Sequence, residues 1–191
     1  MGAAKKLAIG IPTVIIVIVV VLFAYSYTQI NVSLIDASFD SIDWNFSGSS
    51  LLKAGFSVLT GNLLEAAFEI IDGINVNLFF GLSNGGLLPV YIPDISYDLF
   101  INEIPMGTGN SKINETILPG QTKEIVSLQN FKKNSLAPAV FSIVDTGGIL
   151  DLKVSGTAFF NLFGLKIPVP FESTKQISIG DEIRKYFESG N

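Results

Sequence analysis

Cysteine and histidine are both absent from the 191 residues of this chain. Their absence excludes Ser/His/Asp and Cys/His catalytic arrangements, the usual zinc sites, and haem or iron–sulfur ligation. It also excludes disulfides, so stability must come from packing, and redox state does not indicate a compartment. Among the remaining carboxylates, lysines, tyrosines and serines, no nucleophile paired with a base is identifiable. We therefore expect a protein that is not an enzyme and that has no metal site of these usual kinds.

Positive charge is scarce as well, with 12 Lys and Arg against 17 Asp and Glu and a formal net charge of −5. Two of the basic residues, Lys5 and Lys6, precede Tyr27, whereas every acidic residue follows it. The part of the chain after Tyr27 is thus more acidic than the whole. An acidic surface repels phosphate backbones, so nucleic acid is not expected as a partner.

Charge is missing altogether from Leu7 to Tyr27, a run of 21 residues. As a helix this run would extend roughly 30 Å, the thickness of the hydrocarbon core of a bilayer. A cleaved signal peptide is the alternative, with Ala24-Tyr25-Ser26 as its cleavage site. The length of the run and the interfacial position of Tyr25 and Tyr27 favour a retained transmembrane anchor at residues 7–27.

Lys5 and Lys6 also predict the orientation of this anchor, because basic residues flanking a span favour the cytoplasm. Residues 1–6 would then form a cytoplasmic tip of a single-pass protein in the cell membrane, with the C-terminal domain extracytoplasmic. Three Asn-X-Ser/Thr triplets are compatible with that location and give candidate N-glycosylation sites at Asn31, Asn45 and Asn114. One or two such triplets are expected by chance in a chain with this many asparagines.

Alternation of apolar and polar residues predicts about seven strands, at Ile30–Phe39, Ile74–Leu82, Leu88–Asn102, Lys112–Leu118, Lys123–Leu128, Leu150–Phe160 and Leu165–Phe171. No strand-helix-strand alternation favours a parallel sheet. The predicted fold is an antiparallel Ig-like or fibronectin-III-like β-sandwich over residues 28–179, with one or two added helices. Residues 180–191 form a tail, in which Ile183 and Phe187 are four apart and give only a weak docking signal.

Helical periodicity appears twice. In the segment 50–72, apolar residues from Leu52 to Ile70 recur every three or four positions, with Gly61 expected to divide two short helices and Asp72-Gly73 to end the second. A later helix is expected to be capped by Asn134 or Ser135, to hold Pro138 in its first turn and to stop at Gly147-Gly148.

The stretch from Leu88 to Asn102, "LPVYIPDISYDLFIN", predicts one strand with its odd-numbered side chains, from Tyr91 to Ile101, in the core. Asp94 and Asp98 share the other face. They would form an acid/base pair only in a concave site, and a face turned to water is the favoured interpretation. Gly107 to Asn110 is expected to form the next turn, because it lacks the longer glycine pattern of a phosphate loop.

Two further groups of residues give candidate sites. Asp36, Asp40 and Asp43 could surround a hard cation, but no glycine-punctuated loop accompanies them, which favours a solvated acidic loop. Trp44, Phe46 and Phe56 form an aromatic group close in sequence to the anchor. Core packing is the first interpretation of this group, and contact with lipid headgroups is the second.

Several segments together resemble a known family. They are "INVNLFFGLSNGGLLPVYIPDISYDLFINEIPMGTG", "LPGQTKEI", the capped helix, "DLKVSGTAFF" and "IPVPFESTKQISI", in this order between Ile74 and Ile179. This combination resembles the LEA type 2 family, the LEA14-like or WHy (water stress and hypersensitive response) domain. The anchor and the helical stretch resemble archaeal members. One departure is Asn84-Gly85-Gly86, where the family often has Asn-Pro.

The resemblance implies a small β-sandwich without catalytic residues or cofactor, associated with desiccation and stress tolerance. We therefore expect a membrane-anchored protein that protects or organises envelope components under water stress. Two alternatives stay open: an accessory subunit that pairs with protein partners in a membrane or cell-surface assembly, and a carrier of lipid or another apolar ligand.

Overall fold

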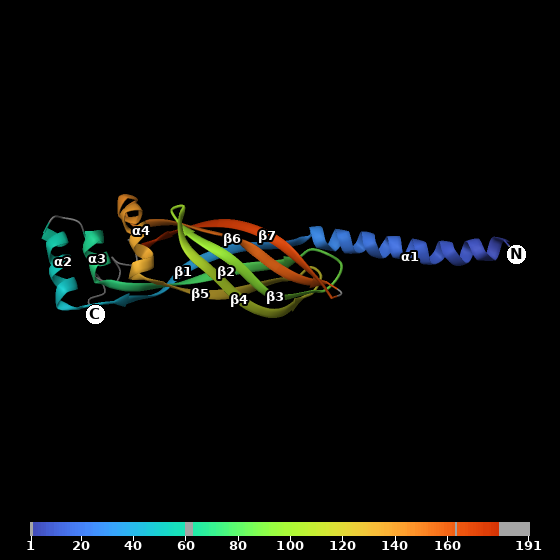
Figure 1. Cartoon of the computed structure of the whole chain (residues 1–191), viewed down its shortest axis with the longest axis horizontal. Coiled ribbons are helices and arrows are strands. Elements are labelled where there is room, and N and C mark those ends of the chain that lie inside the picture. The colour runs from blue at the N-terminus through green and yellow to red at the C-terminus, as the bar shows by residue number, and fades with distance from the viewer. Residues whose placement is uncertain (1, 60–62, 163, 180–191) are drawn as a thin grey trace.

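The computed structural model describes the backbone of residues 2–59, 63–162 and 164–179, and the side chains within 13–53, 66–161 and 164–179. Seven strands and four helices lie in these ranges (Figure 1). The strands form two sheets in which all neighbours are antiparallel. The prediction of a mainly β chain with an antiparallel sandwich and added helices is therefore confirmed. The predicted tail, with Ile183 and Phe187, lies outside the described residues.

The first sheet has three strands in the order β1 (Ile30–Trp44), β2 (Ile71–Asn84) and β5 (Thr122–Lys132). The second has four, in the order β4 (Ile104–Ile117), β3 (Val90–Ile101), β6 (Ile149–Leu162) and β7 (Leu165–Ser178). A constant-type Ig domain has its fourth strand in the first sheet. Here the fourth strand pairs with the third and belongs to the second sheet.

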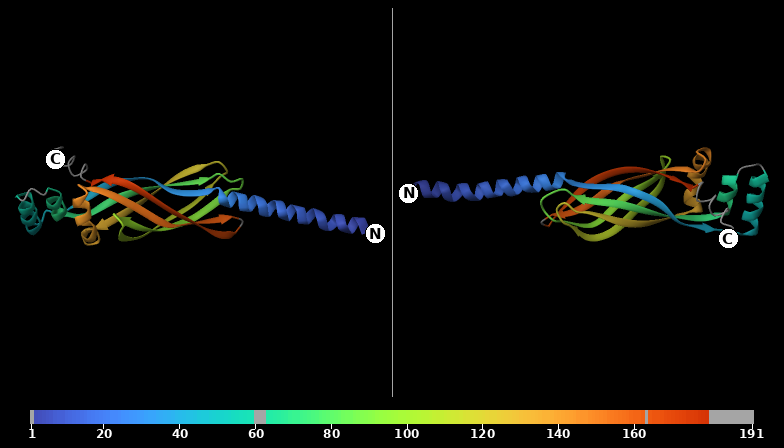
Figure 2. Two further views of the ribbon diagram at one scale, coloured as in Figure 1. Left: turned by 90° about the horizontal axis from the view of Figure 1, so that it is seen from above. Right: turned by 180° about the vertical axis from the view of Figure 1, so that it is seen from behind.

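The helices occupy the two ends of the sandwich. Helix α1 (Gly2–Thr28) projects from one end, and α2 (Gly48–Leu59), α3 (Leu63–Ile70) and α4 (Lys133–Asp145) lie at the other (Figures 1 and 2). Among the residues whose side chains are described, no helix combines the length and the hydropathy needed to cross a membrane.

The core lies between the two sheets and follows the period-two pattern of the strands. Leu78, Phe80 and Leu82 of β2 are fully buried, and side chains of the second sheet face them. The ring of Phe80 lies 5.1 Å from that of Tyr97 and 5.9 Å from that of Phe171, centroid to centroid. Each fully buried apolar side chain stabilises the fold by about 1.5–3 kcal/mol.

The predicted core face of β3 is correct from Ile95 to Ile101 and wrong at Tyr91, which is 38% exposed. The register with β4 shifts between Ile92 and Asp94, where Pro93 lies. A bulge inserts one residue and so exchanges the two faces of a strand. Ile92 is therefore buried in place of Tyr91.

The turn expected at Gly107 to Asn110 is also wrong, because these residues lie inside β4. The chain reverses at Asn102 and Glu103 instead, both with positive φ, at 49° and 64°. Two consecutive residues with positive φ form a tight hairpin turn, and the twist of such a turn matches the twist of the flanking strands. Asn102 also binds neighbours on both sides, accepting from the Asp151 N–H and donating to Ser142 Oγ, each at 2.8 Å.

The start of α4 differs from prediction. Helix α4 begins at Lys133 with Lys132 as an N-cap that makes no side-chain hydrogen bond, so neither Asn134 nor Ser135 caps it, and Pro138 lies inside the helix. Its end at Gly147-Gly148 is confirmed: both glycines have positive φ and their N–H groups bond back to α4.

The predicted pair of short helices before the first long strand is present as α2 and α3, although Gly61 and the side chain of Phe56 lie outside what the structure describes. Helix α3 ends at Ile70, so Asp72-Gly73 belong to β2 and do not end the helix. Ala67 and Ile70 are buried as expected, whereas Leu52 is 79% exposed.

Candidate functional site

A shallow hollow of about 530 Å³, lined mainly by residues with polar side chains, lies on the outer face of the four-stranded sheet. We call it the outer hollow. Its floor has two cross-strand rows, each with one residue from β4, β3 and β6: Thr108, Asp98 and Ser155 form one row, and Asn110, Ser96 and Thr157 form the other. Phe159 lines one end.

The strand on each side of Tyr97 has a glycine next to it, beneath the outer hollow. Tyr97 lies opposite Gly109 of β4 and Gly156 of β6. A Cβ on Gly109 would lie 2.2 Å from the Tyr97 ring, and one on Gly156 would lie 2.3 Å from the Ser96 carbonyl oxygen. The backbone of β3 and the Tyr97 side chain thus occupy the space that two side chains would fill. Gly109 and Gly156 therefore allow β3 to lie close to both of its neighbours beneath the outer hollow.

Most polar side chains that line the outer hollow make no hydrogen bond or ion pair with another side chain in the described part of the protein. Asn110 Nδ2 donates to Ser96 Oγ at 2.8 Å. Among the described residues, no side-chain hydrogen bond or ion pair engages Asp98, Thr108, Ser155 or Thr157. The floor therefore offers a carboxylate, several hydroxyls and an amide to a ligand or to water.

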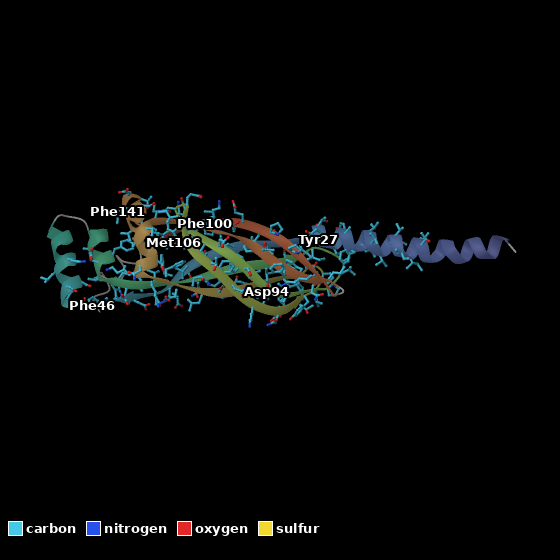
Figure 3. The ribbon with its side chains drawn as sticks, in the orientation of Figure 1. Tyr27, Phe46, Asp94, Phe100, Met106 and Phe141 are labelled. Carbon is cyan, nitrogen blue, oxygen red and sulfur yellow. The ribbon has the colours of Figure 1, made fainter. Side chains whose placement is uncertain are left out.

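Charged pairs lie beside the outer hollow. Lys166 Nζ is 3.9 Å from Asp94 Oδ2 and 4.0 Å from the centre of the Phe159 ring. Lys153 Nζ is 3.3 Å from Glu172 Oε1. Asp94 and Asp98 do share the outer face, as predicted (Asp94 is labelled in Figure 3), but Asp94 faces Lys166 and only Asp98 lines the hollow.

A second depression lies at the far end of the molecule. This α3/α4 groove has a volume of about 430 Å³ and is mainly apolar, with charged residues at its rim. It is lined by Phe68, Glu69, Ile71, Lys133, Leu136, Ala137, Val140, Phe141, Val144 and Asp145. Phe141 is 79% exposed and visible at this end in Figure 3. Leu136, Val140 and Val144 of α4 form one wall of this groove.

A buried cluster of polar side chains connects β3, β4 and β5, which belong to the two different sheets. Tyr97 Oη lies 2.7 Å from Ser127 Oγ, accepts from Gln129 Nε2 at 2.8 Å, and is joined through Ser127 to Ser111. Burial raises the pKa of the Tyr97 hydroxyl, and its hydrogen bonds with the serines oppose part of that rise. Sequence reasoning assigned Tyr97 to the core only, because its partners lie on other strands.

The acidic group predicted as a solvated loop lies on β1 instead. Asp40 Oδ1 accepts from Asn77 at 3.1 Å, and Asp43 accepts from Asn75 at 3.4 Å, so both carboxylates bond to the neighbouring strand. Within the described part of the chain, no cluster of acidic residues is arranged to hold a metal ion.

The aromatic group is not near α1. The rings of Trp44 and Phe46 stack with centroids 6.2 Å apart, and Trp44 packs against the core. Strand β1 runs the length of the sandwich, so this pair lies at the end opposite Tyr27 (Figure 3). The interpretation as lipid-headgroup contact beside the anchor is therefore wrong, and core packing is correct for Trp44.

The three candidate glycosylation asparagines are all exposed. Asn31 lies in β1 and Asn114 in β4, where its Oδ1 accepts from Tyr91 Oη at 2.9 Å. Asn45 follows β1, and its Oδ1 accepts from the Ser47 N–H at 3.0 Å in an Asx turn. Glycosylation at these positions stays a prediction.

No family model matches the chain, and no curated protein matches its sequence. Similar solved structures include a protein from Archaeoglobus fulgidus, 10% identical over 74% of this chain and 97% of that one, with a TM-score of 0.44. A protein from Arabidopsis thaliana is 10% identical over 78% of this chain and 84% of its own, with a TM-score of 0.49. A candidate late embryogenesis abundant (LEA) protein is 15% identical over 76% and 73%, with a TM-score of 0.42. The LEA type 2 assignment stays a prediction from the sequence.

Proposed function

We propose that this chain is a membrane-anchored, non-catalytic protein of the LEA type 2 family, with α1 as its anchor. One observation carries the anchoring. Eight consecutive apolar side chains, Val14 to Val21, are each 52–61% exposed. Eight residues make more than two helical turns, so every face of α1 is apolar there, unlike a surface helix with one polar face. Exposed apolar surface of this kind indicates contact with lipid or protein.

The anchor would run from Leu7 to Tyr27, and its first residues lie outside those whose side chains are described. Lys5 and Lys6 favour a cytoplasmic N-terminus, and the sandwich would then lie outside the cytoplasm. There the domain would protect or organise envelope components under water stress. The sequence motifs between Ile74 and Ile179 support this role.

Anchoring is tested by extraction of membranes at alkaline pH. The full chain is expected to stay with the membrane, and a Val17→Asp/Val20→Asp variant to move to the soluble fraction, because each carboxylate at the centre of a span costs about 2.5–3.5 kcal/mol. Val126→Asp is the matched control, since Val126 is 53% exposed on β5. Equal extraction of all three proteins would contradict the proposal.

The stress role is tested by survival. A deletion strain is expected to lose viability on drying and to regain it with the full chain but not with the Val17→Asp/Val20→Asp variant. Unchanged survival of the deletion strain would contradict the stress role and leave the anchoring result standing.

A second candidate function is the capture of a protein partner or an apolar ligand at the α3/α4 groove. The exposure of Phe141 beside this groove favours it. Gentle extraction followed by mass spectrometry distinguishes a subunit at fixed stoichiometry from bound lipid. Phe141→Ser should weaken either association, whereas Leu165→Ser, a change at a 61% exposed apolar residue outside the groove, should not.

A further inference from the structure

The outer hollow is concave, and its hydrogen-bonding groups are largely free to engage a ligand. Asp98 supplies acceptors only, whereas the hydroxyls of Thr108, Ser155 and Thr157 can each donate and accept. Ser96 Oγ accepts from Asn110 and retains its own O–H to donate. These groups suit a partner that carries many donors and acceptors of its own.

The charges restrict the class of ligand. Lys153 and Lys166 lie next to Glu172 and Asp94, so neither is a free cation for a phosphate or carboxylate. Asp98 would repel such an anion. A single carboxylate is too few ligands for a hard cation such as Ca²⁺. The polar floor also disfavours a purely apolar ligand.

The spacing of the floor restricts the size of the ligand. Neighbouring strands lie about 4.8 Å apart, and alternate residues on one strand lie about 6.7 Å apart. Two rows across three strands therefore present a grid of about 10 Å by 7 Å. This area accommodates one or two pyranose rings lying flat.

We propose that the outer hollow binds neutral carbohydrate. Asp98 accepts hydrogen bonds from two sugar hydroxyls, and Ser96, Asn110, Ser155 and Thr157 bind the others. Phe159 forms an apolar wall for the C–H groups of the sugar. The Lys166 ammonium lies over one face of this ring, 4.0 Å from its centre, in a cation–π contact.

Two kinds of carbohydrate fit this description: a free small sugar, and a polysaccharide chain of the cell surface. Access to a surface polysaccharide rests on the proposed extracytoplasmic location. Carbohydrate binding itself does not rest on that location. If the full chain is extracted from the membrane at alkaline pH, the proposal of a carbohydrate site therefore still stands.

The test uses the full chain in micelles of a sugar-free zwitterionic detergent, since maltoside headgroups would compete. Saturation-transfer NMR and titration calorimetry measure binding of neutral disaccharides and hexasaccharides of glucose, mannose, galactose or N-acetylglucosamine. Binding of a disaccharide as tight as that of its hexasaccharide supports a free sugar. Binding of a hexasaccharide alone supports an extended glycan. Absence of binding across the whole panel at tens of millimolar overturns the inference.

Two variants assign the binding to the outer hollow. Asp98→Asn/Thr157→Val should weaken binding about tenfold through the loss of hydrogen bonds. Ser155→Tyr should abolish binding by filling the floor. Thr174→Val, on β7 outside the hollow, is the matched control and should bind as the wild type does. Unfolding midpoints equal to the wild type confirm that each variant folds. Unchanged affinity in a folded Asp98→Asn/Thr157→Val or Ser155→Tyr protein overturns the assignment.

Discussion

Asn84 is 1% exposed, and its amide group makes three hydrogen bonds at the end of β2. Nδ2 donates to the carbonyl oxygens of Leu88 and Ile117, at 2.8 and 3.0 Å, and Oδ1 accepts from the Gly86 N–H at 3.0 Å. One side chain thus joins the β2–β3 turn to the end of β4. Nothing in the local sequence indicates that Asn84 is buried, because its partners lie on two separate segments.

We expect Asn84→Ala to lower the free energy of unfolding by about 2–4 kcal/mol, because each buried polar group left without a partner costs about 1–3 kcal/mol. Urea unfolding of the full chain measures the change. Asn77→Ala is the control, since Asn77 bonds to Asp40 on the exposed side of the same strand and should lose less than about 1 kcal/mol. Equal losses in the two variants would contradict the structural role of Asn84.

Tyr97 makes the free energy of unfolding depend on pH in the alkaline range. Burial raises its pKa above the ordinary value of 10.0. A raised pKa means that the folded state holds the proton more tightly than the unfolded state does. This contribution to stability is complete below pH 10 and is lost as the pH rises through the folded pKa.

The free energy of unfolding of the wild type should therefore fall more steeply above pH 10 than that of Tyr97→Phe. Urea titrations at a series of pH values from neutral to alkaline provide the comparison. Parallel curves for the two proteins would show that Tyr97 has no such effect.

At the scale of elements, periodicity predicted all seven strands and the helix pair, because each strand has one face in the core and one in water. The turn between β3 and β4 was misplaced because two non-glycine residues, Asn102 and Glu103, adopt positive φ while the nearby glycines do not form the turn. Gly109 is instead a place where Tyr97 packs closely. Sequence alone does not separate these two uses of glycine.

The outer hollow could be predicted only in part. Asp94 and Asp98 were expected on the face turned to water, which is the outer face. Thr108 and Asn110 had been assigned to a turn. A site with contributions from β3, β4 and β6 depends on the register of three strands, and no local pattern specifies that register.

Gly156→Ala tests the close approach of β3 to β6. A Cβ would lie 2.3 Å from the backbone oxygen of Ser96, so a strand must move, and we expect a loss of about 1–3 kcal/mol in stability together with a changed outer hollow. Gly48→Ala is the control, since nothing lies within 4 Å of an added Cβ there. Thermal unfolding measures both, and a neutral Gly156→Ala would contradict the close approach of β3 to β6.

At the scale of the whole molecule, the sandwich separates two apolar regions. Helix α1 leaves one end, and the helices α3 and α4 lie at the other (Figure 2). The α3/α4 groove is therefore at the end opposite α1. Strand β2 has 14 residues, which corresponds to about 45 Å between the ends. With α1 in a bilayer, the groove would stand well away from the lipid, where a protein partner is a better match than a membrane.

The proposed anchoring, with the sandwich outside the cytoplasm, can be tested directly because the chain contains no cysteine of its own. Single cysteines are introduced at Ala3, before the proposed span, and at Thr122, which is exposed on β5. Intact cells are treated with a membrane-impermeant maleimide, and labelling is measured by mass spectrometry before and after lysis. We expect Thr122→Cys to be labelled in intact cells and Ala3→Cys to be labelled only after lysis. Labelling of Ala3→Cys in intact cells, or protection of Thr122→Cys until lysis, would contradict the proposal.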